Sequence, residues 1–349
     1  MLSQDQIEKN IEWLRENGSA PVRYLTYLHL LGASPGSGEM RELWERVEED
    51  PVSREIFSKQ RDDGSWFSGG PWASKPSYVP KSGYTPVSPK YVTTSWILSI
   101  LGEMGYDVGD ERVKRACEYN LTYQWPNGVL AEKRGPSEEM GSDPDPRNAP
   151  CRMSIQLTGL AKVGIGRDPR LRKSFELLKR WAREDGGWVH EGHRDGTSAP
   201  YKIWDRSCPW STYFATTSLF YSGDPSDEEA YRSGLDFLIW HLDRKPEHEI
   251  RRFFWHGHDT VRELLMFSEA GVEPTQRSVK AILDWLDGMC LPEEAYFRYV
   301  GKPVSRMSVR EDGASTVVMK YRLFHLIEDD WLTYYVTRIA SNFQTGKGT

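Results

Sequence analysis

The sequence predicts an all-α fold, an (α/α)6 barrel or toroid of six inner and six outer helices. Three observations support this prediction. A short motif returns at intervals of about 60 residues, long enough for a pair of helices and a turn. Between the copies, apolar segments that end in Gly alternate with segments rich in charge. Six such pairs need nearly all of the 349 residues, so we expect one domain over residues 1–349.

The repeated motif is Gln-x3-Gly-x-Trp, at residues 60–66, 124–130 and 182–188. The second copy has Leu130 in place of the Trp, and the third has Ala182 in place of the Gln. A single copy would indicate only a turn. Three aligned copies indicate a repeating architecture of helix pairs.

Six segments are predicted as inner helices because they are apolar or small on most faces, which is typical of enclosed helices. They are residues 20–32, 93–105, 151–164, 208–223, 258–271 and 315–329. On this assignment, the acidic residues 328–330 stand at the far end of the last inner helix.

The outer helices are clearest at residues 110–123, 168–181, 226–242 and 274–286, and a further helix is expected at about 1–17. The four begin with Asp, Ser or Pro, as helix caps and first turns do. Residues 170–181 carry a single apolar stripe, so this helix should face water on its other side. A closed barrel accounts for the alternation; the alternative is an open solenoid, which needs capping repeats.

Composition limits the class of function. The net charge is −6 and no basic stripe is present, which argues against nucleic acid as a partner. The N-terminus lacks an apolar signal core and no apolar run reaches membrane-spanning length, so we expect a cytoplasmic protein without a transmembrane segment. The 4 cysteines are far apart and form no CxxC pair, which argues against a disulfide framework.

The Gln-x3-Gly-x-Trp copies resemble the QW motifs of the squalene cyclase and protein prenyltransferase β-subunit superfamily, whose members fold as α/α toroids. The resemblance covers about residues 20–340. It implies an enzyme, a transferase or cyclase, that holds a largely apolar, isoprenoid-like substrate in an aromatic-lined cavity, and a partner subunit is one further implication. Trp96, Trp210 and Tyr213, on predicted inner helices, are the aromatic candidates for substrate binding.

Three long breaks in the pattern, at about residues 67–90, 132–150 and 189–206, precede inner helices and should therefore gather at one rim. Cys151, Cys208 and His258 stand at the starts of three consecutive inner helices. Two thiols and an imidazole suit zinc with an open fourth position, and zinc would activate a thiol or a water. The alternative is that these cysteines are buried packing residues.

The resemblance bears on this zinc site in two ways. Prenyltransferase β-subunits carry Asp-x-Cys and a His as zinc ligands; here Asp205 precedes Cys208 by one residue more, which makes Asp205 a candidate fourth ligand. Class II terpene cyclases carry Asp-x-Asp-Asp-Thr where this chain has His256-Gly-His258-Asp259-Thr. The missing carboxylates argue against protonation of an alkene. His258 and Asp259, with His256 beside them, remain candidates for acid/base chemistry in a metal-free cyclase or lyase.

Two arginines near inner-helix starts, Arg152 and Arg262, could bind a phosphate or carboxylate, because the guanidinium binds either in bidentate fashion. Their alternative role is an internal pair with a carboxylate such as Glu263. A third class of function stays open as well. The chain could be a non-catalytic, hydrophobic-ligand-binding toroid, since a fold alone does not specify chemistry.

Overall fold

The computed structural model describes residues 2–66, 93–131, 150–189, 206–250, 260–298 and 329–346. Helices make up nearly all of the regular structure in these ranges, so the predicted all-α class is confirmed. Tertiary contacts divide the chain into two compact units. Unit 1 comprises Met1–Ser58 and Leu242–Thr349, and unit 2 comprises Lys59–His241.

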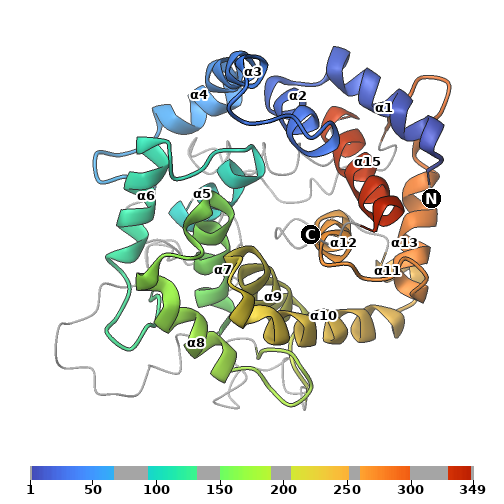
Figure 1. The fold of residues 1–349 in the computed structure, drawn as a ribbon. Helices are drawn as coiled ribbons and strands as arrows, with labels where there is room; N and C mark the ends of the chain where they lie inside the picture. Colours follow the sequence, from blue (N-terminus) through green and yellow to red (C-terminus); the bar gives the residue numbers. More distant parts are fainter. Residues whose placement is uncertain are drawn as a thin grey trace, which may run out of the picture. The chain divides into compact units, whose positions relative to one another are not determined.

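Unit 2 consists of alternating enclosed and amphipathic helices (Figure 1). Its elements are α5 (Thr94–Glu103), α6 (Glu111–Leu121), α7 (Pro150–Leu160) with its π-helical extension η4 (Ala161–Ile165), the 3₁₀ turn η5 (Pro169–Leu171), α8 (Arg172–Arg180), α9 (Pro209–Ser222), the 3₁₀ turn η6 (Pro225–Asp227) and α10 (Glu228–Asp243), whose last residues belong to unit 1.

The enclosed helices of unit 2 are α5, α7 and α9, in which almost every residue is buried. They lie side by side, with α7 between the other two. In α6 and α8 the buried residues form one stripe, such as Ser174, Phe175, Leu177 and Leu178 of α8. The sequence boundaries predicted for these five helices agree with the structure to within a few residues.

Unit 1 contains both ends of the chain. Its elements are α1 (Gln4–Asn17), α2 (Ala20–Leu25) continued by the π-helix η1 (Thr26–Leu30), α3 (Gly38–Glu49), α4 (Pro51–Ser58), α11 (Glu247–Ile250), α12 (Thr260–Glu269), α13 (Arg277–Asp287), the hairpin strands β1 (Cys290–Leu291) and β2 (Tyr296–Phe297), and α15 (Asp329–Thr345). The strands pair antiparallel, with Cys290 opposite Phe297.

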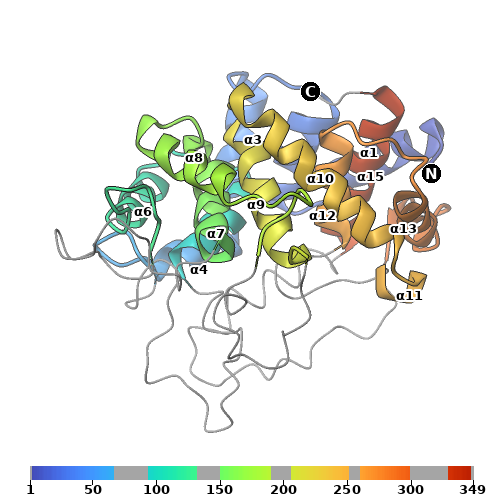
Figure 2. The ribbon, with the colours of Figure 1, turned by 90° about the horizontal axis from the view of Figure 1, so that it is seen from below.

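The N-terminal helix α1 packs along the C-terminal helix α15, and the two lie side by side in both views (Figures 1 and 2). The side chains of Asn10 and Thr337, both buried, hydrogen-bond at 3.1 Å, and Gln344 donates to the Leu2 carbonyl at 2.6 Å. α1 is therefore the amphipathic partner of the last enclosed helix. Within the described ranges this gives six amphipathic helices (α1, α3, α6, α8, α10, α13) and six that alternate with them (α2, α5, α7, α9, α12, α15). Closure of these pairs into one ring stays a prediction.

The last predicted inner helix, residues 315–329, lies outside the described residues except for Asp329. The structure describes a further helix, α15, at Asp329–Thr345, so Asp329 and Asp330 stand at the start of a helix. Asp330 accepts hydrogen bonds from the N–H groups of Trp331 and Ser19, both at 2.8 Å. Carboxylates are favoured at a helix N-terminus, where they face unpaired N–H groups and the positive end of the dipole.

The three motif copies form the same turn. The N–H of Arg61, Trp125 and Arg183 donates to the carbonyl four residues later, at 2.8 to 2.9 Å. The motif glycine has a positive φ in each copy: +85° at Gly64, +94° at Gly128 and +84° at Gly186. A Cβ at Gly128 would also lie 2.8 Å from the carbonyl carbon of Lys173 on the next amphipathic helix. Glycine is required here for its conformation and for its size.

The motif glutamine joins each turn to the start of the next amphipathic helix. Gln60 Nε2 donates to the Arg112 carbonyl at 2.8 Å, and Gln124 Nε2 donates to the Arg170 carbonyl at 2.7 Å. Each accepting carbonyl belongs to the second residue after an N-cap aspartate. That aspartate begins a helix in one copy and a 3₁₀ turn in the other. The glutamine therefore fixes the spacing between consecutive helix pairs.

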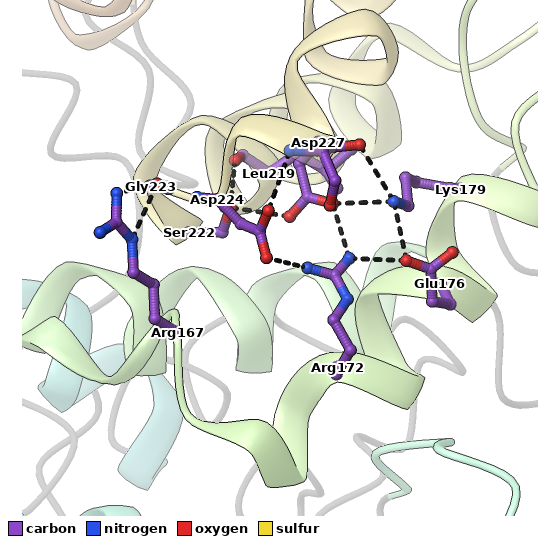
Figure 3. Close-up of polar contacts among 10 residues, drawn as sticks. Arg167, Arg172, Glu176, Lys179, Leu219, Ser222, Gly223, Asp224 and Asp227 are labelled. Atoms are coloured by element: carbon purple, nitrogen blue, oxygen red, sulfur yellow. Dashed lines mark hydrogen bonds and ion pairs between the residues drawn. The ribbon is translucent and has the colours of Figure 1, made fainter.

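In the third copy a lysine makes this contact in place of the glutamine. The side chain of Ala182 has no hydrogen-bond donor. Lys179, one helical turn earlier, donates from Nζ to the equivalent carbonyl of Ser226 at 3.1 Å. Lys179 also pairs at 3.0 Å with Asp227, whose side chain is fully buried (Figure 3). Arg172 contacts the same carboxylate at 2.6 Å. Two cations and the Ser222 hydroxyl compensate for the burial of Asp227.

A related but different turn, which the motif search missed, lies in the β1–β2 hairpin, where Pro292 has no N–H to make the hydrogen bond that the three copies share. Ala295 has φ +59°, where the three copies have glycine. Two residues later, the Phe297 N–H donates to the Thr333 hydroxyl of α15 at 2.8 Å. The same contact joins Trp66 to Thr94 at 3.3 Å and Trp188 to Thr212 at 3.0 Å. The positive φ and the contact with the next enclosed helix are retained, although neither signature residue, Gly or Trp, is present.

Candidate functional site

The candidate site is built on the contact between α7 and α9. The Thr158 hydroxyl donates to the Phe214 carbonyl at 3.1 Å. Two turns later, Gly166 lies so close to the end of α9 that a Cβ on it would be 2.6 Å from the Cα of Ser222. From the first contact to the second, the residue numbers increase along both helices. α7 and α9 are therefore parallel and begin at the same end.

Small residues recur at heptad spacing along both helices. They are Cys151 and Thr158 on α7, and Cys208, Ala215 and Ser222 from the N-cap of α9 to its end. Residues seven apart share one helix face. Carrying the register of Thr158 with Phe214 back by two turns brings Cys151 level with Ser207, the residue before Cys208. The two cysteines therefore stand at the starts of adjacent parallel helices, one residue apart in register. We call these two residues the thiol rung.

The two thiols differ in their surroundings. Cys208 is the N-cap of α9, half-buried, with extended backbone, and its N–H donates to the Trp188 carbonyl at 2.8 Å. Burial raises the pKa of the Cys208 thiol, and the N–H groups of Ser211 and Trp210 partly offset the rise. Cys151 is only 2% exposed. Both side chains are unbridged thiols in this structure.

The three predicted aromatic candidates surround Phe214. Its ring makes edge-to-face contacts with Trp96, Trp210 and Tyr213, with ring centroids 5.4, 5.1 and 5.0 Å apart. Trp96 and Tyr213 are 1% and 2% exposed, so they pack in the core, whereas Trp210 is half-buried. Phe214 was not singled out from the sequence; its spacing of four residues from Trp210 on one helix is the signal that could have found it.

The two predicted arginines lie in different units. Arg152 follows Cys151 on α7 and is half-buried. Arg262 belongs to unit 1, where it is 5% exposed on α12 and its guanidinium lies over the ring of Tyr335, 5.9 Å from the centroid. A cation over an aromatic face is stabilised by the ring quadrupole. This contact gives Arg262 a structural role in unit 1.

The remaining predicted residues, Asp205, His256, His258 and Asp259, lie outside the described residues, as do nearly all residues of the three rim segments. Within the described ranges, no group of three or more His, Cys, Asp or Glu side chains is placed to hold a metal ion. Those ranges therefore supply two thiols, and any further ligand would come from the rest of the chain.

No protein-family model and no curated protein matches the chain. Among solved structures, the apo form of the type II terpene cyclase MstE from Scytonema is similar to it, with 14% sequence identity and a TM-score of 0.40. The match covers 97% of this chain and 98% of that one. A TM-score this low carries no inference about activity.

In the part of the chain that the structure describes, no helix combines the length and the apolar character needed to cross a membrane.

Proposed function

We propose that this protein is an enzyme of the terpenoid cyclase and prenyltransferase type, acting on a largely apolar, isoprenoid-like substrate at the end of unit 2 where α7 and α9 begin. The observation that supports the proposal is the position of the thiol rung. Two cysteines 57 positions apart in sequence stand at the starts of adjacent parallel helices, and the half-buried Trp210 lies in the first turn of the second helix.

The thiol rung fits zinc in donor chemistry, since thiolates are soft ligands that zinc prefers in proteins. Cys151 and Cys208 would supply two ligands, His258 a third, and Asp205 is a candidate for a fourth. Zinc bound in this way lowers the pKa of a thiol or water that occupies its open position. Ligation requires thiolates, and the raised pKa of Cys208 means that metal uptake should release a proton near neutral pH.

The chain's other residues would bind and orient the substrate. Trp210 offers an apolar face with some accessible surface, and Arg152 offers a planar cation for a phosphate or carboxylate group. His258 or Asp259, with His256 nearby, would hold or transfer a proton. The polar end of the substrate would thus lie near the helix starts and its apolar part against the half-buried ring of Trp210, which packs on Phe214.

The metal content of untagged protein, prepared without chelator, tests this proposal. We expect close to one zinc per chain by elemental mass spectrometry, lost in Cys208→Ala and in His258→Ala. Cys290→Ala is the matched control, because Cys290 is a half-buried cysteine of the β1–β2 hairpin in unit 1, and it should retain the metal.

Wild-type protein that takes up no zinc, even when zinc is offered, would contradict the transfer mechanism. Turnover without metal that is lost in His258→Ala or Asp259→Asn would instead favour a metal-free cyclase or lyase. Bound lipid without turnover would favour a non-catalytic, hydrophobic-ligand-binding toroid. A copurifying second chain would identify the partner subunit that prenyltransferase β-subunits need.

A further inference from the structure

We propose that Asp185 is a positioning residue of the candidate site, which fixes the first turn of α9 by holding Ser207. That turn carries Cys208 at its N-cap, followed by Trp210. The inference rests on two departures of the third motif copy from the other copies, at Asp185 and at Gly187. Only its consequence for metal binding rests on the proposed function, because the anchoring itself consists of hydrogen bonds within unit 2.

The first turn of α9 has no counterpart in α5. In both helix pairs the motif tryptophan donates its N–H to a threonine hydroxyl, Trp66 to Thr94 and Trp188 to Thr212. The helix α5 begins at that threonine, whereas α9 begins three residues before it, at Pro209. The additional turn is therefore not required by the repeat.

The carboxylate of the third motif turn contacts a residue outside its own turn. Asp185 Oδ2 accepts from the Ser207 N–H at 2.8 Å, and Oδ1 accepts from the Ser207 hydroxyl at 2.6 Å. In the first copy, Asp63 accepts the same two kinds of hydrogen bond from Ser65, at 3.0 and 2.6 Å. The serine held by the carboxylate thus lies inside the turn in the first copy, and directly before Cys208 in the third.

Gly187 provides the space for this contact. It stands where the first copy has Ser65 and the second has Val129. A Cβ on Gly187 would lie 2.4 Å from the Cβ of Ser207 and 2.6 Å from the hydroxyl oxygen of Thr212. Its φ lies outside the left-handed range, so glycine is needed here for its size alone. The two departures of the third copy therefore act on the same residue, Ser207.

Ser207 depends on Asp185 because it is almost wholly enclosed. It is 1% exposed, so its N–H and hydroxyl need partners inside the protein. The preceding residue is anchored separately, since the Arg206 guanidinium lies over the Trp240 ring of α10, 4.4 Å from the centroid. Loss of the carboxylate would leave two buried donors at Ser207 without their acceptor. The start of α9 would then have to open or shift to restore their hydrogen bonds.

The position of Ser207 limits that of the proposed ligand. Consecutive Cα atoms are about 3.8 Å apart, so Cys208 cannot move far while Ser207 is held. Metal–ligand distances vary by only about 0.2 Å, so a small shift of Cys208 would weaken a zinc site. Asp185 itself would contact neither metal nor substrate. It would act through Ser207, as groups that orient metal ligands do.

The anchoring is tested by comparing Asp185→Ala with Asp63→Ala. The control is matched, because the Asp63 carboxylate also holds the N–H and hydroxyl of one serine. Amide hydrogen exchange in metal-free protein, read by mass spectrometry with fragmentation to single residues, should be faster at Ser207 in Asp185→Ala by at least about tenfold. Asp63→Ala should leave it unchanged. Unchanged exchange at Ser207 in Asp185→Ala would overturn the proposal.

Zinc affinity, measured by competition with a chelating dye, tests the consequence for the site. It should fall about 10–100-fold in Asp185→Ala and stay unchanged in Asp63→Ala. Asp185→Asn keeps an oxygen that can accept from Ser207, so it should recover most of the loss. Gly187→Ala keeps the carboxylate but displaces Ser207, and should also lower the affinity. Near-ultraviolet circular dichroism verifies that each variant is folded. Equal affinities in Asp185→Ala and Asp63→Ala would overturn the positioning role.

The two proposals fail separately. Wild-type protein that binds no zinc would contradict the proposed function, whereas faster exchange at Ser207 in Asp185→Ala would still support the anchoring of α9. Zinc that depends on Cys208, with an affinity that Asp185→Ala does not change, would support the proposed function and overturn the role of Asp185.

Discussion

At the scale of single residues, the turn that separates the helix pairs depends on backbone conformation more than on side-chain identity. Gly64, Gly128 and Gly186 share positive φ values, and each lies against the backbone of an amphipathic helix. Ala295 shows that the conformation survives in the hairpin without glycine. An L-residue in this region costs about 1–2 kcal/mol, which glycine avoids.

Gly128→Ala should lower the free energy of unfolding by at least about 2 kcal/mol, since it combines the positive-φ cost with overlap against the Lys173 backbone. Gly38→Ala is the matched control, because a Cβ there meets nothing within 4 Å and its φ is not positive. It should be neutral or slightly stabilising. Urea unfolding measures both. Equal effects of the two substitutions would contradict the requirement for glycine in the turn.

Asp168 illustrates how charge at the helix starts contributes to stability. Its carboxylate accepts from the Arg170 N–H at 2.9 Å and pairs with the Arg170 guanidinium at 2.6 Å. The Arg170 side chain lowers the pKa of Asp168. A carboxyl whose folded pKa lies below its unfolded value of about 3.9 stabilises the fold above that pH. This stability is lost as the pH falls through the folded pKa.

Asp168→Asn should therefore reduce the difference in unfolding free energy between pH 7 and pH 3, by no more than about 1 kcal/mol, because Arg170 is half-exposed. Asparagine still caps the 3₁₀ turn, so the change isolates the charge. Urea titrations of both proteins at the two pH values measure it. An unchanged pH difference would show that the Asp168–Arg170 pair contributes nothing to acid stability.

At the scale of elements, the third motif copy keeps its contact by using a different residue. Lys179 reaches the Ser226 carbonyl in place of the missing glutamine, and it also helps to neutralise the buried Asp227 (Figure 3). The contact between consecutive pairs is thus retained although the residue that makes it has moved by one helical turn.

Lys179→Ala should destabilise the fold by about 1–3 kcal/mol, because the buried carboxylate of Asp227 would lose one of its two cationic partners and keep the other, Arg172. Adding Ala182→Gln should recover part of this loss, because the new side chain can donate to Ser226. Ala182→Gln alone should have little effect, since Lys179 already occupies that carbonyl. Thermal unfolding of the three variants measures the coupling between positions 179 and 182. Additive effects of the two substitutions would contradict the conclusion that Lys179 has replaced the motif glutamine.

The sequence predicted these elements where a local pattern specifies them. Glutamine, glycine and tryptophan at fixed spacing, with at most one of them replaced in each copy, identified three turns, and apolar composition identified α5, α7, α9 and α12. The turn at Ala295 was missed because its conformation is imposed by the hairpin and by the contact of Phe297 with α15. The register of α7 against α9 depends on contacts between helices, which no local pattern contains. The gathering of the three long breaks at one rim was predicted only from their positions before the starts of inner helices.

At the scale of the whole molecule, unit 1 is assembled from both ends of the chain, and α1 covers α15. The sequence identified a helix at residues 1–17 but did not assign it a partner, and it predicted no helix that begins at Asp329. Both omissions have one cause. Pairing between the first and last helices is a long-range contact, and the apolar residues of α15 carry no motif that marks its start.

Leu14→Ala should cost about 2–5 kcal/mol, because Leu14 of α1 is fully buried and its removal leaves a cavity. Leu31→Ala is the matched control: Leu31 is 46% exposed, and its removal should cost less than about 0.5 kcal/mol. Denaturant unfolding followed by tryptophan fluorescence measures both. A small effect at Leu14 would show that α1 is not needed to cover the last enclosed helix.

The central claim is that Cys151 and Cys208 act together as neighbouring ligands. Loading the protein with cobalt(II) in place of zinc tests it most directly, because each thiolate ligand adds to the near-ultraviolet charge-transfer absorption. The account predicts an absorption band for two thiolates in the wild type, roughly halved in Cys151→Ser and in Cys208→Ser and unchanged in Cys290→Ser. Cobalt bound without such a band, or a band that neither cysteine affects, would contradict the account.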